Sequence, residues 1–211
     1  MTDPYQLYGA RNSRSTRVAW LLEELGVPWV WHPLSFRNGD HRTADFRALN
    51  PSGKVPVLVH GQLVLTESGA ISRYLCAQHP EAGLLPPHGS AQAALVDQWL
   101  FFVTTELEQP LWLKAKHTFA LPQKLRVPDV RATAEAEFGR AAKVASVLFG
   151  EGRYAVGEQF TLADLFLAHT CLWASAAKQW DRLPPSLQEH AQQQLERPAY
   201  KRALAREKQA S

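Results

Sequence analysis

Residues 50–68 combine the residue types needed to bind a small anion. Turn-forming residues lead into two apolar runs, 57–59 and 63–65, whose spacing predicts the two strands of a β-hairpin. Glu67 and Ser68 stand directly before a helical pattern, and Ser68 has the sequence position of an N-cap. Because the first N–H groups of a helix lack partners within it, this entrance favours a carboxylate. The same residues also fit a capped helix that packs on a hairpin and binds nothing.

Pro56 stands where the first strand of this hairpin begins. Proline has no N–H group and a fixed φ, so it suits the first residue of a strand, a bulge or an edge. A cis Val55–Pro56 bond would turn the backbone N–H and C=O of Val55 toward a ligand. Only about 5–6% of X–Pro bonds in folded proteins are cis, so composition does not identify one.

The order Asn50-Pro-x-Gly-Lys-Val-Pro, a short hairpin and then Glu67-Ser68 before a helix resembles the glutathione-binding half of cytosolic glutathione transferases. The resemblance implies a cis Val55–Pro56 bond, with Pro56 structural and the Val55 backbone pairing with the cysteinyl unit of glutathione. It also implies that Glu67 and Ser68 hold the γ-glutamyl end. Glutathione is then a co-substrate, and no metal is required.

Two further residues could bind the glycine carboxylate of glutathione. Lys54 belongs to the Gly-Lys-Val-Pro motif and could supply a positive charge, although an exposed lysine beside a turn is equally ordinary. His41 lies nine residues before Asn50, a spacing similar to that of a carboxylate-binding histidine in theta-like members of the family. A histidine in a surface loop is the alternative interpretation.

The chemistry is expected in the loop after the first strand. A transferase must present the glutathione sulfur as a thiolate, and lowering a thiol pKa from about 8.5 by about two units makes the thiolate the majority form at pH 7. Ser13 precedes Arg17 by four residues, as the catalytic serine does in serine-type theta- and delta-like or related bacterial-type members. Those members often have Ser-x-Pro, which this chain lacks, so Asn12 and Ser15 remain rivals. Either serine could instead only cap the helix.

The elements around these residues predict an α/β domain in residues 1–80. An alternating strand at residues 5–8 is followed by a helix that Gly26 ends, a second strand at 28–34 and a polar segment at 36–47. The hairpin and a last helix complete the order. A βαβ half followed by an antiparallel half is the pattern of a thioredoxin-like domain.

The rest of the chain predicts an all-helical domain. Residues 81–89 have the composition of a linker, and residues 90–211 show helical periodicity. Helices are expected at about 91–108, 129–149, 162–178, 185–195 and 199–208. Thr161 and Asp164 have the form of a capping box, flanked by Phe160 and Leu165 as a hydrophobic staple, so Asp164 is assigned a structural role. Glutathione transferases carry a similar cap at the matching place.

Composition excludes several other classes of function. The 211 residues carry a net charge of +3 without a run of basic residues, which argues against nucleic acid as a partner. No apolar stretch has the length of a membrane span, and the N-terminus lacks a signal sequence, so no membrane association and a cytoplasmic location are expected. Cys76 and Cys171 lie in apolar helical patterns, as buried thiols do, and no Cys-x-x-Cys occurs. The eight histidines show no metal-ligand spacing.

These observations predict a glutathione transferase that activates the glutathione thiolate for attack on an electrophilic, apolar co-substrate. The resemblance implies a detoxification enzyme that forms a homodimer. Two alternatives stay open. One is a glutathione-dependent peroxidase or disulfide-bond reductase, for which Asn12 is the more suggestive residue, and the other is a non-catalytic module that binds a ligand or a protein.

Overall fold

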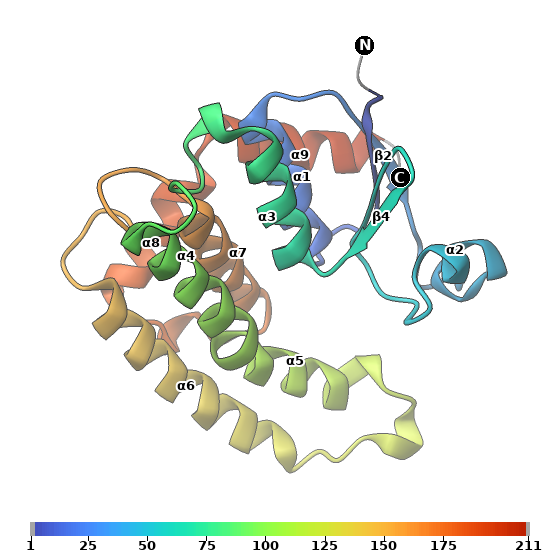
Figure 1. Ribbon diagram of the computed structural model, residues 1–211. Coiled ribbons are helices and arrows are strands. Elements are labelled where there is room, and N and C mark those ends of the chain that lie inside the picture. The colour runs from blue at the N-terminus through green and yellow to red at the C-terminus, as the bar shows by residue number, and fades with distance from the viewer. Residues whose placement is uncertain (1–2, 210–211) are drawn as a thin grey trace. The chain divides into compact units, whose positions relative to one another are not determined.

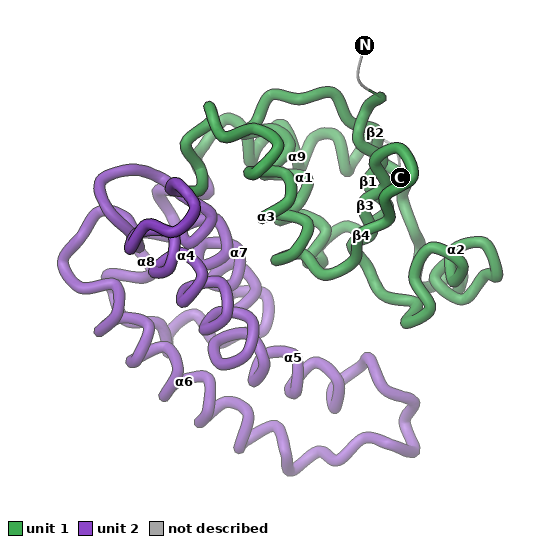
Figure 2. Tube along the Cα trace, in the orientation of Figure 1, with its two compact units in different colours: residues 1–85, 196–211 green, residues 86–195 purple. Residues whose placement is uncertain are grey.

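The computed structural model describes residues 3–209 of the chain. The chain divides into two compact units, coloured separately in Figure 2. The first unit comprises residues 1–85 and 196–211, and the second comprises residues 86–195. The division between residues 85 and 86 falls inside the predicted linker, whereas residues 1–2 and 210–211 of the predicted domains lie outside the described part.

The first unit is built on a four-stranded sheet (Figure 1). Its strands are β1 (Tyr5–Gly9), β2 (Trp29–Pro33), β3 (Val57–His60) and β4 (Leu63–Thr66), in the spatial order β2-β1-β3-β4. β1 and β2 are parallel, while β1 and β3, and β3 and β4, are antiparallel. The predicted thioredoxin-like fold is therefore confirmed.

Two helices connect these strands and a third follows the last strand, in the predicted order. They are α1 (Ser15–Leu25), α2 (Ala44–Leu49) and α3 (Ser68–Gln78), with short 3-10 turns at Asp40–Arg42 and Pro80–Ala82. α1 ends at Gly26, whose φ of 66° is the left-handed conformation expected of a C-cap glycine. Tyr5, Leu7 and Gly9 of β1 are buried while the residues between them are half-buried, which is the alternation of a strand with one face on a core.

The last helix, α9 (Pro198–Gln209), belongs to the first unit rather than to the helices that precede it. It packs along α1, where Tyr200 meets Trp20 with ring centroids 4.9 Å apart. Arg197, just before α9, donates two hydrogen bonds to Glu24 of α1, with Nε–Oε1 and Nη2–Oε2 distances of 2.6 and 2.9 Å. The predicted helical domain of residues 90–211 includes α9, because helical periodicity does not identify the partner of an apolar face.

The second unit is all-helical, as predicted (Figure 1). Pro110 lies in the first turn of the helix Gln109–Ala115, where its missing N–H needs no partner. Segments of π-helix at Val103–Leu107 and Lys116–Ala120 extend the first two helices, and 3-10 turns follow at Gln123–Leu125 and Trp180–Arg182. The helices are α4 (Ala91–Phe102), α5 (Gln109–Ala115), α6 (Val130–Phe149), α7 (Leu162–Ala176) and α8 (Pro185–Leu195).

The predicted capping box is present at the start of α7. Asp164 Oδ2 accepts from Thr161 N at 2.8 Å and lies 3.1 Å from Thr161 Oγ1, while its Oδ1 accepts from Ala155 N at 2.7 Å. Asp164 is fully buried, and so are most residues of α7. The cap thus fixes where the central helix of this unit begins. None of the helices in residues 3–209 combines the length and apolarity needed to cross a membrane.

Candidate functional site

Strand register brings three predicted segments to one edge of the sheet. Tyr8, next to the end of β1, pairs with Val57 at the start of β3, and Val57 pairs with Thr66 at the end of β4. The loop that follows Gly9, the Val55–Pro56 bond and the Glu67–Ser68 pair therefore all leave the sheet at the same edge. Residues separated by more than fifty positions in sequence become neighbours through this register alone.

The Val55–Pro56 peptide bond is cis, as the resemblance implied. Pro56 is buried and Val55 is half-buried at the start of β3. The approach to this bond is held by Asn50, a buried residue whose Nδ2 donates to the carbonyl of Lys54 at 2.7 Å. Sequence reasoning treated Asn50 only as a turn former, although its amide is the group that orders the loop before Val55.

The entrance of α3 differs from the prediction in one respect. Glu67, and not Ser68, is the N-cap, because Glu67 has φ 66° and ψ 115° while its carbonyl accepts the first helical bond from Ile71 N at 3.0 Å. Ser68 is already the first residue of the helix and is buried. No side chain caps this helix, so its first N–H groups are available to an anion.

Glu67 is also one of three non-glycine residues in 3–209 with a positive φ, together with Asn12 and Lys178. Holding such a residue in this sparsely populated region costs about 1–3 kcal/mol and is typical of ligand-binding positions. Its side chain is exposed at the edge where the Val55–Pro56 bond emerges. The Glu67 carboxylate is therefore open to solvent at this edge of the sheet.

His41 lies against the turn that precedes Lys54. A Cβ added to Gly53, which has φ 64°, would stand 2.9 Å from the carbonyl oxygen of His41, so the two backbones approach closely. Lys54 itself is exposed beside this contact, whereas His41 is half-buried. The structure thus brings together the two residues predicted to bind the glycine carboxylate.

The protonation state of His41 follows from its surroundings. Burial, followed by the positive charges of Arg42 and Arg47, lowers the pKa of His41 from its ordinary value, and Asp40 acts in the opposite direction. His41 is therefore neutral at pH 7. Because its Nε2 accepts a hydrogen bond from Arg42 Nε at 3.2 Å, its proton is on Nδ1. The Nδ1 atom is itself buried and has no hydrogen-bond partner among the described residues, so a carboxylate can accept its proton only if this loop moves.

The Ser13 hydroxyl is at the centre of the loop after β1. Its Oγ donates to the carbonyl of Ala10 at 2.6 Å, accepts from Ser15 N at 3.1 Å and lies 3.0 Å from Ser15 Oγ. Ser13 is half-buried, so a ligand can reach this hydroxyl but must displace the Ala10 carbonyl as its acceptor. Ser15 is fully buried, and Asn12 is exposed with φ 55°.

Gly9 permits α1 to begin close to β1. A Cβ at Gly9 would lie 2.5 Å from Ser15 Cβ and 2.5 Å from an atom of the Trp31 ring. Real side chains do not tolerate such distances, so any larger residue would displace the first turn of α1 together with the Ser13 loop. The alternating pattern predicted only a strand at residues 5–8 and did not indicate this steric requirement at Gly9.

The protein's own thiols do not contribute to the site. Cys76 and Cys171 are free and buried, and burial raises the pKa of each thiol to about 12. Both are therefore protonated and inert at pH 7. Residues 3–209 also contain no group of three or more His, Cys, Asp or Glu side chains placed to hold a metal ion.

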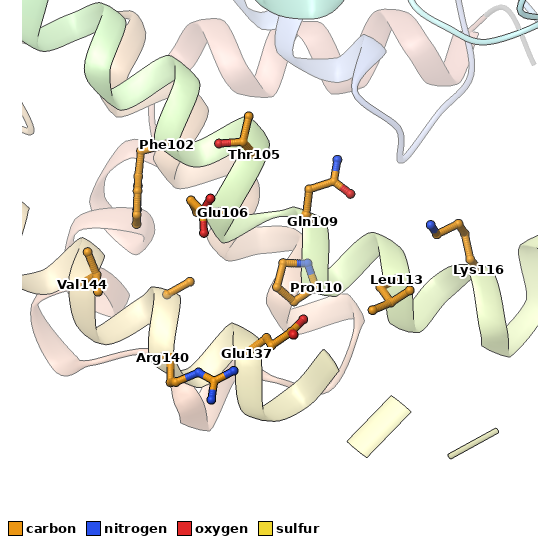
Figure 3. Close-up of a pocket in the computed structure, with 11 residues that line it drawn as sticks. Phe102, Thr105, Glu106, Gln109, Pro110, Leu113, Lys116, Glu137, Arg140 and Val144 are labelled. Atoms are coloured by element: carbon orange, nitrogen blue, oxygen red, sulfur yellow. The ribbon is translucent and has the colours of Figure 1, made fainter. Parts of the chain in front are cut away.

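The second unit contains a cavity of about 510 Å³ between α6 and the segment from α4 to α5. Figure 3 shows Glu106 and Phe102 on one side and Arg140 and Val144 of α6 on the other. Apolar, polar and charged side chains all line it. The first unit has a smaller hollow of about 380 Å³, lined by Tyr8, His32 and residues of α2.

Comparison with known proteins identifies the family. Residues 13–78 match the model of the glutathione S-transferase N-terminal domain, and residues 108–179 match that of the C-terminal domain. Glutathione S-transferase 3 of Zea mays is 35% identical over 167 residues, which cover 76% of this chain and 74% of the maize protein. The chain belongs to the glutathione S-transferase family, which confirms the predicted enzyme class.

Solved structures agree with this assignment. Ure2p in complex with glutathione superposes with a TM-score of 0.84 at 25% identity, covering 97% of this chain and 99% of that chain. The transferase URE2P8 of Phanerochaete chrysosporium, solved with oxidised glutathione, has the same fold with a TM-score of 0.86 at 19% identity, covering 99% and 97%. None of these names designates a theta- or delta-like protein, so that part of the resemblance stays a prediction.

Proposed function

We propose that this protein binds glutathione at the sheet edge described above, activates its thiol with Ser13 and transfers the sulfur to an electrophilic, apolar co-substrate. The observation that carries the proposal is the convergence of the Ser13 loop, the cis Val55–Pro56 bond and the Glu67–Ser68 helix entrance at one edge. The glutathione in the solved Ure2p complex supports glutathione as the co-substrate.

Each part of glutathione has a chemically matched group in this site. The free backbone of Val55 pairs with the cysteinyl unit, as an added strand would. The Glu67 carboxylate receives the α-amino group of the γ-glutamyl unit, while the Ser68 hydroxyl and the first N–H groups of α3 receive its carboxylate. Lys54 and the neutral His41, which lie beside the turn at Gly53, bind the glycine carboxylate.

Activation requires Ser13 to change its hydrogen-bond acceptor. Ser13 Oγ donates to the Ala10 carbonyl at 2.6 Å, and the sulfur of bound glutathione replaces this acceptor. A hydrogen bond to the thiolate but not to the thiol favours ionisation, and the thiol proton leaves to solvent. The thiolate then forms a bond from sulfur to the electrophilic carbon, and the electron pair moves to the leaving group or the acceptor atom of the co-substrate.

Disulfide-bond reduction is the second candidate function, with Asn12 in place of Ser13. Asn12 is exposed at the tip of the same loop with φ 55°, and the URE2P8 structure was solved with oxidised glutathione. In this reaction a second glutathione thiolate attacks the glutathionyl sulfur of a bound mixed disulfide. The original S–S bond breaks, the partner leaves as a thiolate that takes a proton from solvent, and oxidised glutathione forms. Loss of disulfide reduction in Asn12→Ala, with unchanged transfer to 1-chloro-2,4-dinitrobenzene, would favour it.

We further infer that the protein acts as a homodimer in the cytoplasm and serves detoxification. Family membership supports the dimer, and exposed Val144, Val147 and Leu148 leave an apolar strip on α6. Two buried, reduced cysteines suit a reducing compartment. Light scattering should give twice the chain mass of 23.6 kDa, and a mass of one chain would reject the dimer.

The activation step is tested by following the thiolate absorbance of bound glutathione near 240 nm against pH. We expect the wild-type complex to ionise well below the free thiol and Ser13→Ala to ionise close to it. Equal pKa values in both proteins would remove Ser13 from the mechanism and leave Asn12 as the next residue to change. An absence of glutathione binding would overturn the enzyme proposal as a whole.

A further inference from the structure

The cavity of the second unit has the size of a small-molecule site. Its volume of about 510 Å³ lies within the range of roughly 300–1,000 Å³ that is usual for ligand pockets. All of its lining belongs to residues 102–116 and to α6, so the cavity is complete within this unit. Figure 3 shows Phe102 and Val144 at one end and Lys116 at the other. The cavity therefore has an apolar end and a charged end.

The charged side chains of the lining are not paired with one another. Two are acidic and two are basic: Glu106, Lys116, Glu137 and Arg140. Within residues 3–209, none of the four forms an ion pair or a side-chain hydrogen bond. The same two helical segments do pair their charges outside the cavity, where Lys114 Nζ lies 2.8 Å from Glu135 Oε1. The cavity thus presents unpaired charges of both signs.

The backbone beside the cavity is irregular, which is an independent sign of function. A π-helix occupies Val103–Leu107, where the N–H of Glu108 donates to the carbonyl five residues earlier at 2.9 Å, and a second π-helix occupies Lys116–Ala120. Such turns are rare and are found frequently at functional sites. The first contributes Glu106 to the lining and the second contributes Lys116. Both irregular turns therefore supply charged groups to one cavity.

These features define the chemistry of a ligand. A neutral ligand would bury charged groups of the lining without partners, which is costly. Carboxylates suit Lys116 and Arg140, the arginine through two parallel hydrogen bonds, and an ammonium group suits Glu106 or Glu137. An apolar substituent suits the end formed by phenylalanine and valine. The ligand should therefore combine carboxylates, an ammonium group and an apolar group.

The product of the proposed reaction combines these groups. A glutathione S-conjugate keeps the two carboxylates and the ammonium group of glutathione, and it carries an apolar substituent on sulfur in place of the thiol proton. Glutathione alone has the charges but not the apolar substituent, while an apolar co-substrate lacks the charges. Of the molecules that take part in the proposed reaction, the conjugate matches the cavity best.

We propose that this cavity is a second, non-catalytic binding site for glutathione S-conjugates. The inference rests on the proposed function, because the conjugate is the product of that reaction. Its residues are distinct from those of the sheet edge where the thiol is activated. The second unit then holds the product while the sheet edge takes another glutathione.

Equilibrium dialysis with S-hexylglutathione tests the proposal. Wild type should bind two molecules per chain, and Arg140→Gln should weaken one of the two sites about tenfold, because a charge-assisted pair is lost. Lys143→Gln is the matched control, since Lys143 is an exposed cation of α6 that does not line the cavity. Binding that Arg140→Gln leaves unchanged, or that both variants weaken equally, would overturn the proposal.

The apolar end is tested with a second pair of variants. Val144 and Val147 are both exposed on α6, but only Val144 lines the cavity. Val144→Ala should weaken S-hexylglutathione at this site about three- to tenfold, and Val147→Ala should not. Equal effects would point to the apolar strip as a whole and contradict the cavity as the site. Glutathione should bind there at least about tenfold more weakly than S-hexylglutathione, and equal affinities would exclude the conjugate as the preferred ligand.

Glu67→Gln distinguishes a failure of this inference from a failure of the proposed function. Glu67 belongs to the sheet edge, so Glu67→Gln should weaken one site for S-hexylglutathione and Arg140→Gln the other. If the only site found is the one that depends on Glu67, the cavity proposal is wrong and the proposed function stands. If the only site found is the one that depends on Arg140, the cavity site stands and the sheet-edge proposal is wrong.

Discussion

Replacing Asp164 by alanine should destabilise the second unit far more than the loss of an ordinary helix cap. Asp164 is fully buried and accepts from two backbone N–H groups, of Ala155 and Thr161, at 2.7 and 2.8 Å. Truncation leaves both donors buried without a partner, and each such group costs about 1–3 kcal/mol. Part of this cost is offset because a buried carboxylate is removed. We expect the free energy of unfolding to fall by about 3–5 kcal/mol.

Urea unfolding at pH 7, followed by circular dichroism, measures this change. Ser90→Ala is the matched control, because Ser90 is the N-cap of α4 and its Oγ accepts one bond, from Ala93 N at 3.1 Å. Loss of such a cap costs about 1 kcal/mol. The ratio of the two effects therefore reports the extra bond that Asp164 makes to Ala155, outside its own helix.

A loss in Asp164→Ala no greater than that in Ser90→Ala would refute this reasoning. It would mean that the segment around Ala155 can relax and satisfy its N–H group with water. Asp164 would then act only as a local cap of α7, and its bond to Ala155 would add nothing to the stability.

Three further predictions concern binding, packing and pH. Glu67→Gln should weaken glutathione binding about tenfold in calorimetry, since a charge-assisted bond to the γ-glutamyl amine is lost, and unchanged affinity would exclude that contact. Gly139→Ala should raise the free energy of unfolding by about 0.5–1 kcal/mol, because α6 has room for a Cβ there, whereas Gly9→Ala should lower both stability and glutathione affinity. As the pH rises from 4.5 to 7, the free energy of unfolding of His190→Gln should fall by roughly 2 kcal/mol relative to that of the wild type. Burial raises the pKa of Asp164 to about 6, so the stability that protonated Asp164 contributes is lost as the pH rises through that value. Burial lowers the pKa of His190 to about 4, so in the wild type the stability contributed by neutral His190 increases as the pH rises and offsets this loss. Parallel pH profiles of the two proteins would contradict this.

The features that local pattern encodes were predictable from the sequence. The order of strands and helices in the first unit follows from alternating runs, turn residues and Gly26, and the structure reproduces it. The capping box at Asp164 was found because its members are three residues apart. The cis Val55–Pro56 bond came from the family resemblance, since the residues alone do not distinguish it from a trans bond.

The features that depend on distant or fine geometry were not predictable. The sequence offered Ser68 as a cap, because serine prefers that position, but the backbone at Glu67 takes the non-helical conformation that defines it. The packing of α9 along α1 joins segments from opposite ends of the chain, and no periodicity reveals it. Which hydroxyl is accessible also required coordinates, because burial separates Ser13 from Ser15 two residues away.

The most direct test of the account is the pKa of the glutathione thiol bound to wild-type protein and to Ser13→Ala. The account predicts a bound pKa about two units below that of the free thiol in wild type, and a value near the free thiol, about 8.5, in the variant. A wild-type pKa that stays near the free value, or one that is equally low without the Ser13 hydroxyl, would contradict the claim that this loop activates glutathione through Ser13.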